Sequence, residues 1–534
     1  MSEDKNAHPA NGTPHVDALA GTAFAKVRRS KLSVLGLTCG PLLAVAVYLA
    51  IPTRHVGGGE ITSGLAFPGR VVAAVGTLMA VLWVTEAIPI PATALIPIAL
   101  FPILTGGEVT VRQAAAPYAH DLIFLFMGGF MLALAMQRWN LHRRIAMRTI
   151  FVIGPRPPAV VAGFMAASAF LSMWVSNTAT VVMMLPIAMS VVELVKSRLR
   201  ETENAHRPTE GRPFNFAICL MLGTAYAASI GGIGTLIGTP PNLLLVAFLR
   251  SEYGVEISFV RWLAVGLPLV LVFLPITWLL LTRFIYPIRL KMIPGEREFI
   301  KSEIDRLGPM SRGEWSVLIV FLATAAAWVT RPVLAQMTLG GAKPLAGLSD
   351  AGIAIAAAVA LFALPVDLKK GVFVLTWEQT RKLPWGILIL FGGGLSLAAA
   401  VKSTGVAEFL GASVAGLSEI PVPILVLLVT ATVVFLTELT SNTATTATFL
   451  PILGAVAVGL GVSPALLVVP MAIGASCAFM MPVATPPNAI VFSSGEITIP
   501  QMCKAGLWLN LIGIALIMGL TYTVIVSVLM GTAA

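Results

Sequence analysis

The sequence predicts an all-α polytopic membrane protein, and composition, span length and pattern all favour this fold class. The chain has 534 residues, of which 57% are hydrophobic and only 11% are charged. Its mean hydropathy of +0.89 lies far outside the range of soluble domains. Continuous apolar stretches recur along it, for example at 32–51, 71–90 and 505–528. Because a β-barrel would show short alternating segments instead, we expect about 11 transmembrane helices in a lipid bilayer.

The basic residues predict the orientation of the chain. Residues 1–31 form a polar tail, and no small-residue cleavage site follows the first apolar stretch, so we expect a retained first helix. When loops alternate from an inside N-terminus, 27 of the 35 Lys and Arg residues fall inside. This bias predicts a bacterial-type inner membrane protein with a cytoplasmic N-terminus and an external C-terminus. Topology thus explains the net charge of +10, and we expect no nucleic-acid partner.

One apolar segment breaks the alternation. Residues 157–192 carry no charge, yet both flanks are basic and favour the cytoplasm. A single helix of these 36 residues would be roughly 54 Å long, nearly twice the hydrocarbon thickness. A re-entrant hairpin fits instead, with its turn at the Ser-Asn-Thr sequence of 176–178, whose residues favour caps and turns. Such irregular backbone must be buried in protein or line a cavity.

Three short motifs occur twice, in the same order. They are Phe-x-Gly-Gly at 126–129 and 391–394, Ser-Asn-Thr-Ala-Thr at 176–180 and 441–445, and Thr-Pro-Pro-Asn at 239–242 and 485–488. The first two lie 48 positions apart in both halves, measured from Gly128 to Ser176 and from Gly393 to Ser441. The next spacing is 63 in the first half and 44 in the second, and the excess of 19 matches a polar insert at 196–214. The chain is therefore predicted to contain two repeats.

The two repeats are predicted to have opposite orientations in the membrane. The first hairpin has cytoplasmic ends, whereas the alternation of loops places the ends of the second hairpin, about 421–462, outside. Inverted-topology repeats are typical of secondary transporters, which bind their substrates near the midplane where the repeats meet. The glycines of the Phe-x-Gly-Gly motifs are expected to serve close helix packing.

The doubled Thr-Pro-Pro-Asn motif predicts a broken helix in each half. Proline removes a backbone donor and disfavours helix at the preceding residue, so the first helix should stop there and restart after Pro241. The freed N–H groups favour an anion, while freed carbonyls and Ser, Thr and Asn oxygens suit Na⁺. Neither hairpin turn contains Arg or Lys, and residues 439–495 contain no charge. A bound di-anion would therefore be neutralised by helix ends and co-bound cations.

The paired Ser-Asn-Thr and Thr-Pro-Pro-Asn motifs resemble those of the divalent anion:sodium symporter family, the INDY-like carboxylate transporters. The resemblance covers about residues 31–530. It implies a homodimer in which a transport domain moves against a scaffold domain like an elevator. The corresponding division is a polar tail at 1–31, scaffold helices at 32–140, a transport-domain half at 157–287, a cytoplasmic linker at 288–314, scaffold helices at 315–415 and a second transport-domain half at 421–530.

The same resemblance implies the site residues. The first sodium site would comprise Ser172, Ser176, Asn177 and the carbonyl of Gly238, and the second Thr437, Thr440, Asn442 and Ala484. The substrate carboxylates would contact Ser176, Asn177, Thr178, Ser441, Asn442 and Thr443, helped by Thr239, Thr485 and Pro486. Thr440 stands where some members have Ala, which changes little if only its carbonyl binds sodium.

These observations predict a sodium-coupled symporter of C4-dicarboxylates such as succinate, malate or fumarate, with no enzymatic activity and no cofactor besides the coupling ion. The alternatives are a sodium-independent dicarboxylate or tricarboxylate exchanger, a sulfate symporter, an anion channel and a membrane receptor. Glu86 and Glu438 are acids within apolar stretches and therefore functional candidates. Glu438 either tunes the second cation site or pairs elsewhere.

Overall fold

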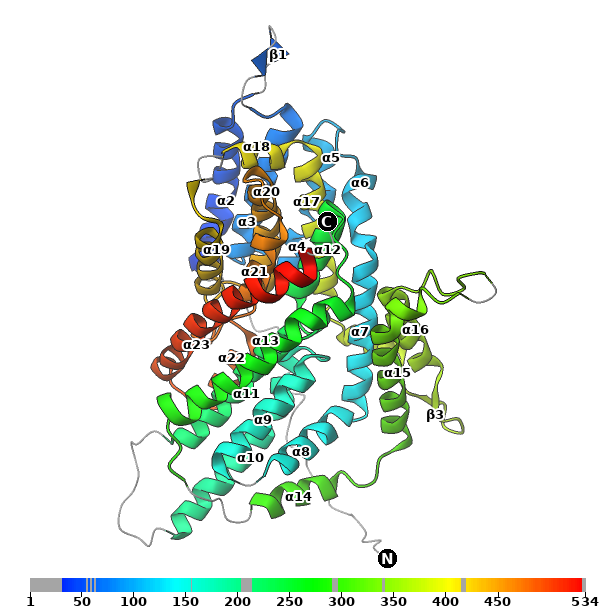
Figure 1. Cartoon of the computed structure of the whole chain (residues 1–534), viewed down its shortest axis with the longest axis vertical. Helices are drawn as coiled ribbons and strands as arrows, with labels where there is room; N and C mark the ends of the chain where they lie inside the picture. The colour runs from blue at the N-terminus through cyan, green and yellow to red at the C-terminus, as the bar shows by residue number, and fades with distance from the viewer. Residues whose placement is uncertain are drawn as a thin grey trace, which may run out of the picture.

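The computed structural model describes residues 31–53, 56–57, 60–61, 64–154, 156–202, 214–290, 296–338, 341–413 and 419–530, and these residues are mainly helical (Figure 1). Ten of the described helices are long and apolar enough to cross a membrane, and five further apolar helices are shorter. The predicted all-α polytopic fold is thereby confirmed. Except for Lys31, the expected polar tail lies outside the described residues.

The first half of the chain extends from an apolar helix that begins at Lys31 to a π-helical segment. Its elements are α2 (Lys31–Ala50), β1 (Val56–Gly57), β2 (Glu60–Ile61), α3 (Phe67–Val84), α4 (Ile90–Thr93), α5 (Ile96–Leu104), α6 (Val111–Ala115), η2 (Ala116–Ala119), α7 (Asp121–Arg138), α8 (Leu141–Ile153), α9 (Pro157–Ser172), α10 (Asn177–Thr202), α11 (Asn215–Ile233), α12 (Pro240–Tyr253), α13 (Phe259–Leu279) and the π-helical η3 (Leu280–Ile285). Strands β1 and β2 pair as a short antiparallel hairpin.

The second half has a similar order of helices, although its two strands follow its third helix, whereas β1 and β2 follow the first helix of the first half. It comprises α14 (Glu296–Arg306), α15 (Arg312–Leu334), α16 (Asp350–Ala363), β3 (Pro365–Asp367), β4 (Val372–Phe373), η4 (Trp377–Lys382), α17 (Trp385–Ser403), α18 (Val406–Ser413), α19 (Val422–Leu436), α20 (Asn442–Gly459), α21 (Ala465–Ala475), α22 (Pro486–Phe492), α23 (Ile499–Leu520) and the π-helical η6 (Thr521–Met530). Strands β3 and β4 are antiparallel.

Both predicted hairpin turns coincide with breaks between helices. The first arms, α9 and α19, have 16 and 15 residues and at 1.5 Å per residue are too short to cross about 30 Å of hydrocarbon. The second arms, α10 and α20, begin at Asn177 and Asn442. Ser441 caps α20, because its hydroxyl accepts a hydrogen bond from the Ala444 amide. Each Ser-Asn-Thr motif therefore lies at the start of a second arm.

The two halves pack against each other reciprocally. Helix α11 packs on the first arm α9 of its own half, and α21 packs on its own first arm α19. Across the halves, α22 packs on the second arm α10, and α12 packs on the second arm α20. Each broken helix therefore joins the hairpin of its own repeat to the hairpin of the other repeat.

The broken helices differ in one respect from the prediction. Helix α11 already ends at Ile233, and α12 begins at Pro240, so the unwound segment precedes the prolines and the expected restart after Pro241 is wrong. In the second half the unwound segment is longer, from the end of α21 at Ala475 to Pro486. Proline favours the first position of a helix, where its missing N–H has no partner to lose. The prolines therefore start the second segments and do not stop the first.

The glycines of the Phe-x-Gly-Gly motifs allow close packing, as predicted. A Cβ on Gly128 of α7 would lie 2.6 Å from the backbone of Ala354 in α16. A Cβ on Gly393 of α17 would lie 2.3 Å from the carbonyl oxygen of Ala94, directly after α4. The corresponding glycines thus make corresponding helix contacts in the two repeats. Figure 1 shows α15 and α16 beside the lower part of α7.

A buried ion pair joins α8 to the connection between the halves. Arg144 donates to Glu314 at 2.6 Å and to the backbone carbonyls of Leu307 and Gly308 at 3.1 and 2.9 Å. Glu314 also accepts from the Ser311 amide at 2.7 Å, closing a capping box at the start of α15. Both charged side chains are buried, and each is satisfied by its partner and by backbone groups.

We expect Arg144→Ala to destabilise the protein by about 3–5 kcal/mol, because it leaves the Glu314 carboxylate buried without its partner. The adjacent Arg143 provides a matched control, since its side chain is 41% exposed and pairs with Glu303 at 2.9 Å. Arg143→Ala should cost less than about 1 kcal/mol. Thermal unfolding of both variants in detergent measures the difference, and equal losses would contradict it.

Candidate functional site

Each hairpin tip contains the same hydroxyl–amide pair. In the first half the Ser172 hydroxyl donates to the Asn177 side-chain oxygen at 2.5 Å. In the second half the Thr437 hydroxyl donates to the Asn442 side-chain oxygen at 2.7 Å. Both pairs span the break between the two arms of a hairpin, and both are five residues apart. Each hairpin tip therefore brings uncharged side-chain oxygen atoms together at the N-terminus of a second arm.

The asparagine of each Thr-Pro-Pro-Asn motif holds the unwound segment before it. The Asn242 amide donates to the carbonyls of Gly232 and Thr235 at 3.1 and 2.8 Å. The Asn488 amide donates to the carbonyls ten and seven residues before it, both at 3.1 Å. The side-chain oxygens of both asparagines are buried and have no partner among the described residues. The two broken helices are thus stabilised in the same way.

Three residues of the first predicted sodium site lie around Gly232. A Cβ on Gly232 would lie 2.6 Å from the Asn177 side-chain oxygen, and a Cβ on Gly238 would lie 2.4 Å from the Gly232 carbonyl. The Thr235 hydroxyl donates to the carbonyl of Met173 at the hairpin tip. Tip and unwound segment therefore meet here, with Ser172 beside Asn177. The Ser176 hydroxyl accepts from the Ala179 amide at 3.3 Å.

The second predicted sodium site is gathered less completely. Besides its bond to Asn442, the Thr437 hydroxyl donates to the Ala475 carbonyl at 2.9 Å. The Thr440 hydroxyl bonds to the Leu436 carbonyl and the Thr445 hydroxyl, which leaves its own carbonyl as the group for a cation. Ala484 is buried just before α22, but no hydrogen bond among the described residues joins it to Thr437 or Asn442.

Glu438 pairs with the unwound segment of the second half. It is 4% exposed, and its carboxylate accepts hydrogen bonds of 2.7–3.1 Å from three consecutive backbone amides, Phe479 to Met481. The Asn510 amide of α23 donates to the same carboxylate at 2.8 Å. Of the two roles considered for Glu438, these contacts favour pairing elsewhere. Glu86, in contrast, is exposed after α3 and has a φ of 46°.

The remaining predicted substrate contacts differ in exposure, and Thr239 and Thr485 are buried. The hydroxyls of Thr178 and Thr443 have no hydrogen-bond partner among the described residues, and both side chains are half-buried. Thr239 is the N-cap of α12, but its hydroxyl makes no capping hydrogen bond. The Thr485 hydroxyl accepts a hydrogen bond from the backbone N–H of Asn488 at 3.4 Å. Pro486 is the first residue of α22 and is exposed. The free hydroxyls are suited to donate to a carboxylate.

Sequence reasoning missed several of these residues. The asparagines of the Thr-Pro-Pro-Asn motifs were visible in a doubled pattern, although the prediction gave them no role. Gly232 and Asn510 carry no local signal, because their importance comes from the side chain that packs against or bonds to each of them.

We expect Gly232→Ala to raise the half-saturating Na⁺ concentration for uptake by about tenfold or more. The reason is that the new methyl group displaces the Asn177 side chain. Gly223→Ala in the same helix is the control, since its nearest neighbour is the flexible side chain of Met165 at 3.0 Å. Uptake measured against external Na⁺ concentration tests this expectation. An unchanged half-saturating Na⁺ concentration in Gly232→Ala would contradict it.

Two repeated hairpins whose tips meet two broken helices are typical of secondary transporters. The family model described as the sodium:sulfate symporter transmembrane region matches residues 44–529. The chain belongs to the divalent anion:sodium symporter family, as its motifs predicted. Because this is a family of transporters, the expectation that the chain is not an enzyme is also confirmed.

Named relatives are similar over almost the whole chain. The sodium-dependent dicarboxylate transporter SdcS of Staphylococcus aureus (strain USA300) is 41% identical over 513 residues, covering 95% of each chain. The protein of the same name from Staphylococcus saprophyticus is 40% identical over 498 residues, covering 93% of this chain and 92% of the relative. The crystal structure of the Alcanivorax borkumensis YdaH transporter is similar with a TM-score of 0.56 at 14% identity, covering 95% of this chain and 99% of that one. That structure is similar in fold.

Proposed function

We propose that this protein is a sodium-coupled symporter of C4-dicarboxylates such as succinate, malate and fumarate. The observation that carries the proposal is the doubled hydroxyl–amide pair, Ser172 with Asn177 and Thr437 with Asn442, at two hairpin tips. The names of the Staphylococcus relatives, which are sodium-dependent dicarboxylate transporters, favour the same substrate class and coupling ion.

The geometry supports one Na⁺ at each tip and the substrate between the tips. Hydroxyl, amide and carbonyl oxygens suit a hard cation, and in the proposed first site they come from Ser172, Ser176, Asn177 and Gly238. The proposed second site takes Thr437, Asn442 and the carbonyls of Thr440 and Ala484. The substrate carboxylates then bond to the Ser-Asn-Thr motifs, with Thr239, Thr485 and Pro486 beside them. Since neither tip carries a cationic side chain, the bound Na⁺ ions supply much of the positive charge that a di-anion needs.

Movement of the substrate is assigned to an elevator within a homodimer. In this proposal the scaffold helices at 32–140 and 315–415 stay fixed, while 157–287 and 421–530 move. Contacts at the end of α12 support such a division, because they join moving and fixed parts through polar side chains. They are Arg250 to Asp121 at 2.5 Å, Ser251 to His120 at 3.2 Å and Lys402 to Glu252 at 3.7 Å. The side chains of Arg250 and Asp121 are 40% and 44% exposed, so their ion pair contributes little stability and breaks at low cost when the domain moves.

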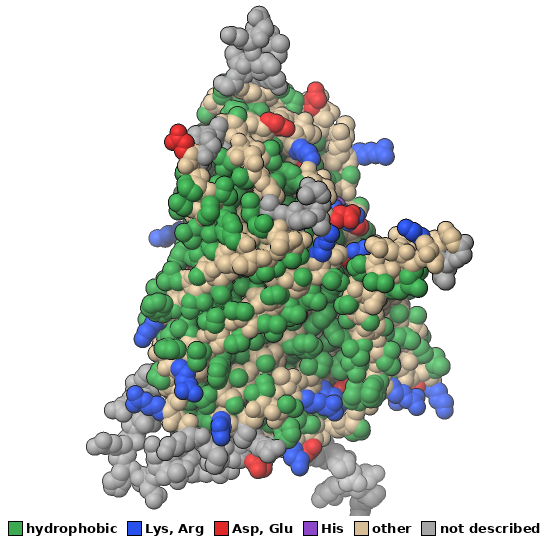
Figure 2. Space-filling view, viewed as in Figure 1, with side chains coloured by type: hydrophobic (Ala, Val, Ile, Leu, Met, Phe, Trp, Pro, Cys, Tyr) green, Lys and Arg blue, Asp and Glu red, His purple; other side chains and the backbone are tan. Residues whose placement is uncertain are grey.

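The orientation remains the one predicted from the basic loops, with the N-terminus in the cytoplasm and the C-terminus outside a bacterial-type inner membrane. Figure 2 shows hydrophobic side chains across the middle of the visible face and many Lys and Arg side chains near its lower edge. A cytoplasmic lower edge agrees with the excess of basic residues in inside loops.

Uptake of radiolabelled succinate into proteoliposomes tests the proposal. We expect uptake into empty vesicles under an inward Na⁺ gradient and none under an equal K⁺ gradient. Uptake that ignores Na⁺ but requires internal succinate would instead establish an exchanger and remove both sodium sites. Because the matching family model is described as a sodium:sulfate symporter, unlabelled sulfate is added as a competitor. Inhibition by sulfate stronger than by malate would overturn the dicarboxylate assignment.

A further inference from the structure

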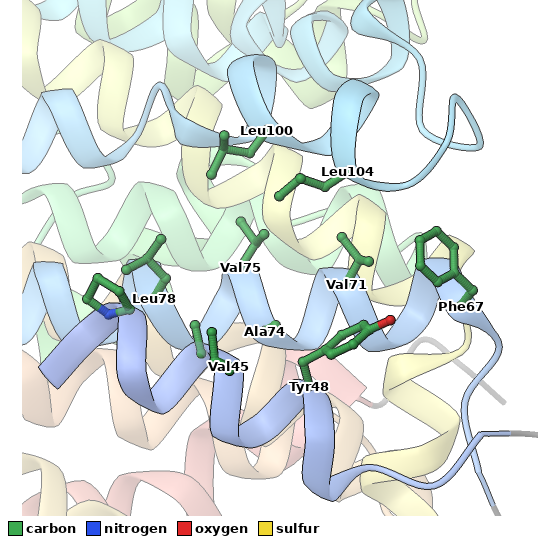
Figure 3. A pocket seen from close by; sticks show the side chains of 11 residues that line it. Val45, Tyr48, Phe67, Val71, Ala74, Val75, Leu78, Leu100 and Leu104 are labelled. Atoms are coloured by element: carbon green, nitrogen blue, oxygen red, sulfur yellow. The ribbon is translucent and has the colours of Figure 1, made fainter.

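An apolar groove of about 430 Å³ lies between α2, α3 and α5, far along the chain from either hairpin. Its walls are formed by side chains such as Val45 of α2, Val71 and Val75 of α3, and Leu100 and Leu104 of α5. Figure 3 shows Leu100 and Leu104 facing Val75 and Val71 across the groove. Only 11% of the residues in the apolar window of α2 are buried, and the exposed apolar side chains are suited to face the membrane.

The groove has the length of one membrane leaflet. It extends along α3 from Phe67 to Leu78, which at 1.5 Å per residue is roughly 16 Å. Half of a hydrocarbon core of about 30 Å is about 15 Å. In Figure 3, Phe67 and Tyr48 lie at one end of the groove and Leu78 at the other. A single acyl chain therefore fits along the groove with its polar end beside Tyr48 and Phe67.

A cation lies at that polar end. The guanidinium of Arg70 stacks over the Tyr48 ring, with its carbon 4.3 Å from the ring centre. It donates to the Tyr48 carbonyl at 2.6 and 3.1 Å and to the Thr53 hydroxyl at 2.7 Å. These bonds use three of its five N–H groups, and no described carboxylate pairs with it. Arg70 is thus held in place with two donors left for an anion, and guanidinium binds phosphate in a bidentate manner.

From the leaflet-long groove and the fixed guanidinium at its mouth, we propose that α2, α3 and α5 bind one phospholipid, with an acyl chain in the groove and the phosphate on Arg70. Neither observation involves the transport site, so the proposal is independent of the transported substrate. The other occupant that an apolar groove admits is a second copy of the chain, which would bring no phosphate to Arg70.

Native mass spectrometry of delipidated protein with added phosphatidylglycerol tests the site. The wild-type protein should retain one phosphatidylglycerol molecule more tightly than any further phosphatidylglycerol molecule. Diacylglycerol with the same acyl chains should bind about tenfold more weakly, because it lacks the phosphate. Arg70→Gln should weaken the binding of phosphatidylglycerol by a similar factor and leave the binding of diacylglycerol unchanged. Val45→Trp should remove the binding of both, because the indole fills the groove; Val45 is 57% exposed, so the fold tolerates the change.

Two control variants distinguish this site from general lipid binding. Arg112→Gln removes another exposed cation, and Leu271→Trp adds an indole to α13, where Leu271 is 63% exposed. Both should retain the tight phospholipid. Binding that survives Val45→Trp, or that falls equally in Arg70→Gln and Arg112→Gln, would overturn the proposal. Cross-linking of two chains through a cysteine at position 45 would also overturn it, because a second copy would then cover the groove.

Discussion

We expect the replacement of either Asn177 or Asn442 by alanine to lower sodium-coupled succinate uptake by about a hundredfold, while the protein still inserts and folds normally. The side-chain oxygen of each asparagine accepts a hydrogen bond from the hydroxyl of Ser172 or Thr437. Each of these oxygens also belongs to a proposed sodium site. Losing a group that orients a metal ligand costs about 10–100-fold in ion affinity, and losing the ligand itself should cost no less. Because the same asparagines also face the substrate in the proposal, both losses act on one uptake rate.

Asn215→Ala is the control for these substitutions. Asn215 lies at the start of α11 and donates to the Pro287 carbonyl at 3.1 Å, away from both hairpin tips. Its replacement should leave uptake within about twofold of wild type, since one neutral hydrogen bond contributes only about 1 kcal/mol to stability. Size-exclusion profiles and melting temperatures establish that all variants are folded. Robust uptake by both Asn177→Ala and Asn442→Ala would remove the proposed site.

Glu438→Gln has the second-largest expected effect. The carboxylate accepts from three backbone amides that precede α22, and glutamine replaces one of its two oxygens with an NH₂ group that cannot accept. At least one buried N–H then loses its partner, at a cost of about 1–3 kcal/mol. We expect uptake to fall by about tenfold or more and the melting temperature to drop, because the segment before Thr485 is no longer held.

Glu256→Gln controls for loss of a negative charge, since the Glu256 side chain is 78% exposed. It should change neither uptake nor stability measurably. Asn510→Ala offers an independent test, because it removes the 2.8 Å bond to Glu438 while leaving the carboxylate in place. Its effect should be in the same direction and smaller. A Glu438→Gln variant with wild-type uptake and melting temperature would show that the segment is held by other contacts.

The positions of the hairpin turns and of the broken helices were predictable, because their motifs occur twice in the sequence. The doubled Ser-Asn-Thr motifs located both hairpin turns, and the structure places each asparagine at the first position of a second arm. The prolines at 240 and 486 marked both broken helices, although they start the second segments. Local chemistry was sufficient here, since caps and prolines act within one turn of helix.

The parts that escaped prediction depend on contacts between distant segments. Glu438 lies about 40 residues before the backbone amides that donate hydrogen bonds to it. Its counterpart in the first half is Met173, so the repeat pattern gave no guidance about its role. Gly232 matters because Asn177 packs against it. The lengths of the unwound segments also differ between the halves, and no motif announces that difference. Such features follow from tertiary packing, which a single sequence does not reveal.

The most direct test of the central account is the equilibrium affinity for succinate measured at several Na⁺ concentrations at constant ionic strength. If each hairpin tip holds one Na⁺ that binds with the substrate, the logarithm of Kd falls with the logarithm of Na⁺ concentration with a slope of about two. Asn177→Ala should reduce that slope to about one. A Kd that is the same in Na⁺ and in K⁺ would contradict sodium coupling and with it the assignment of the doubled site.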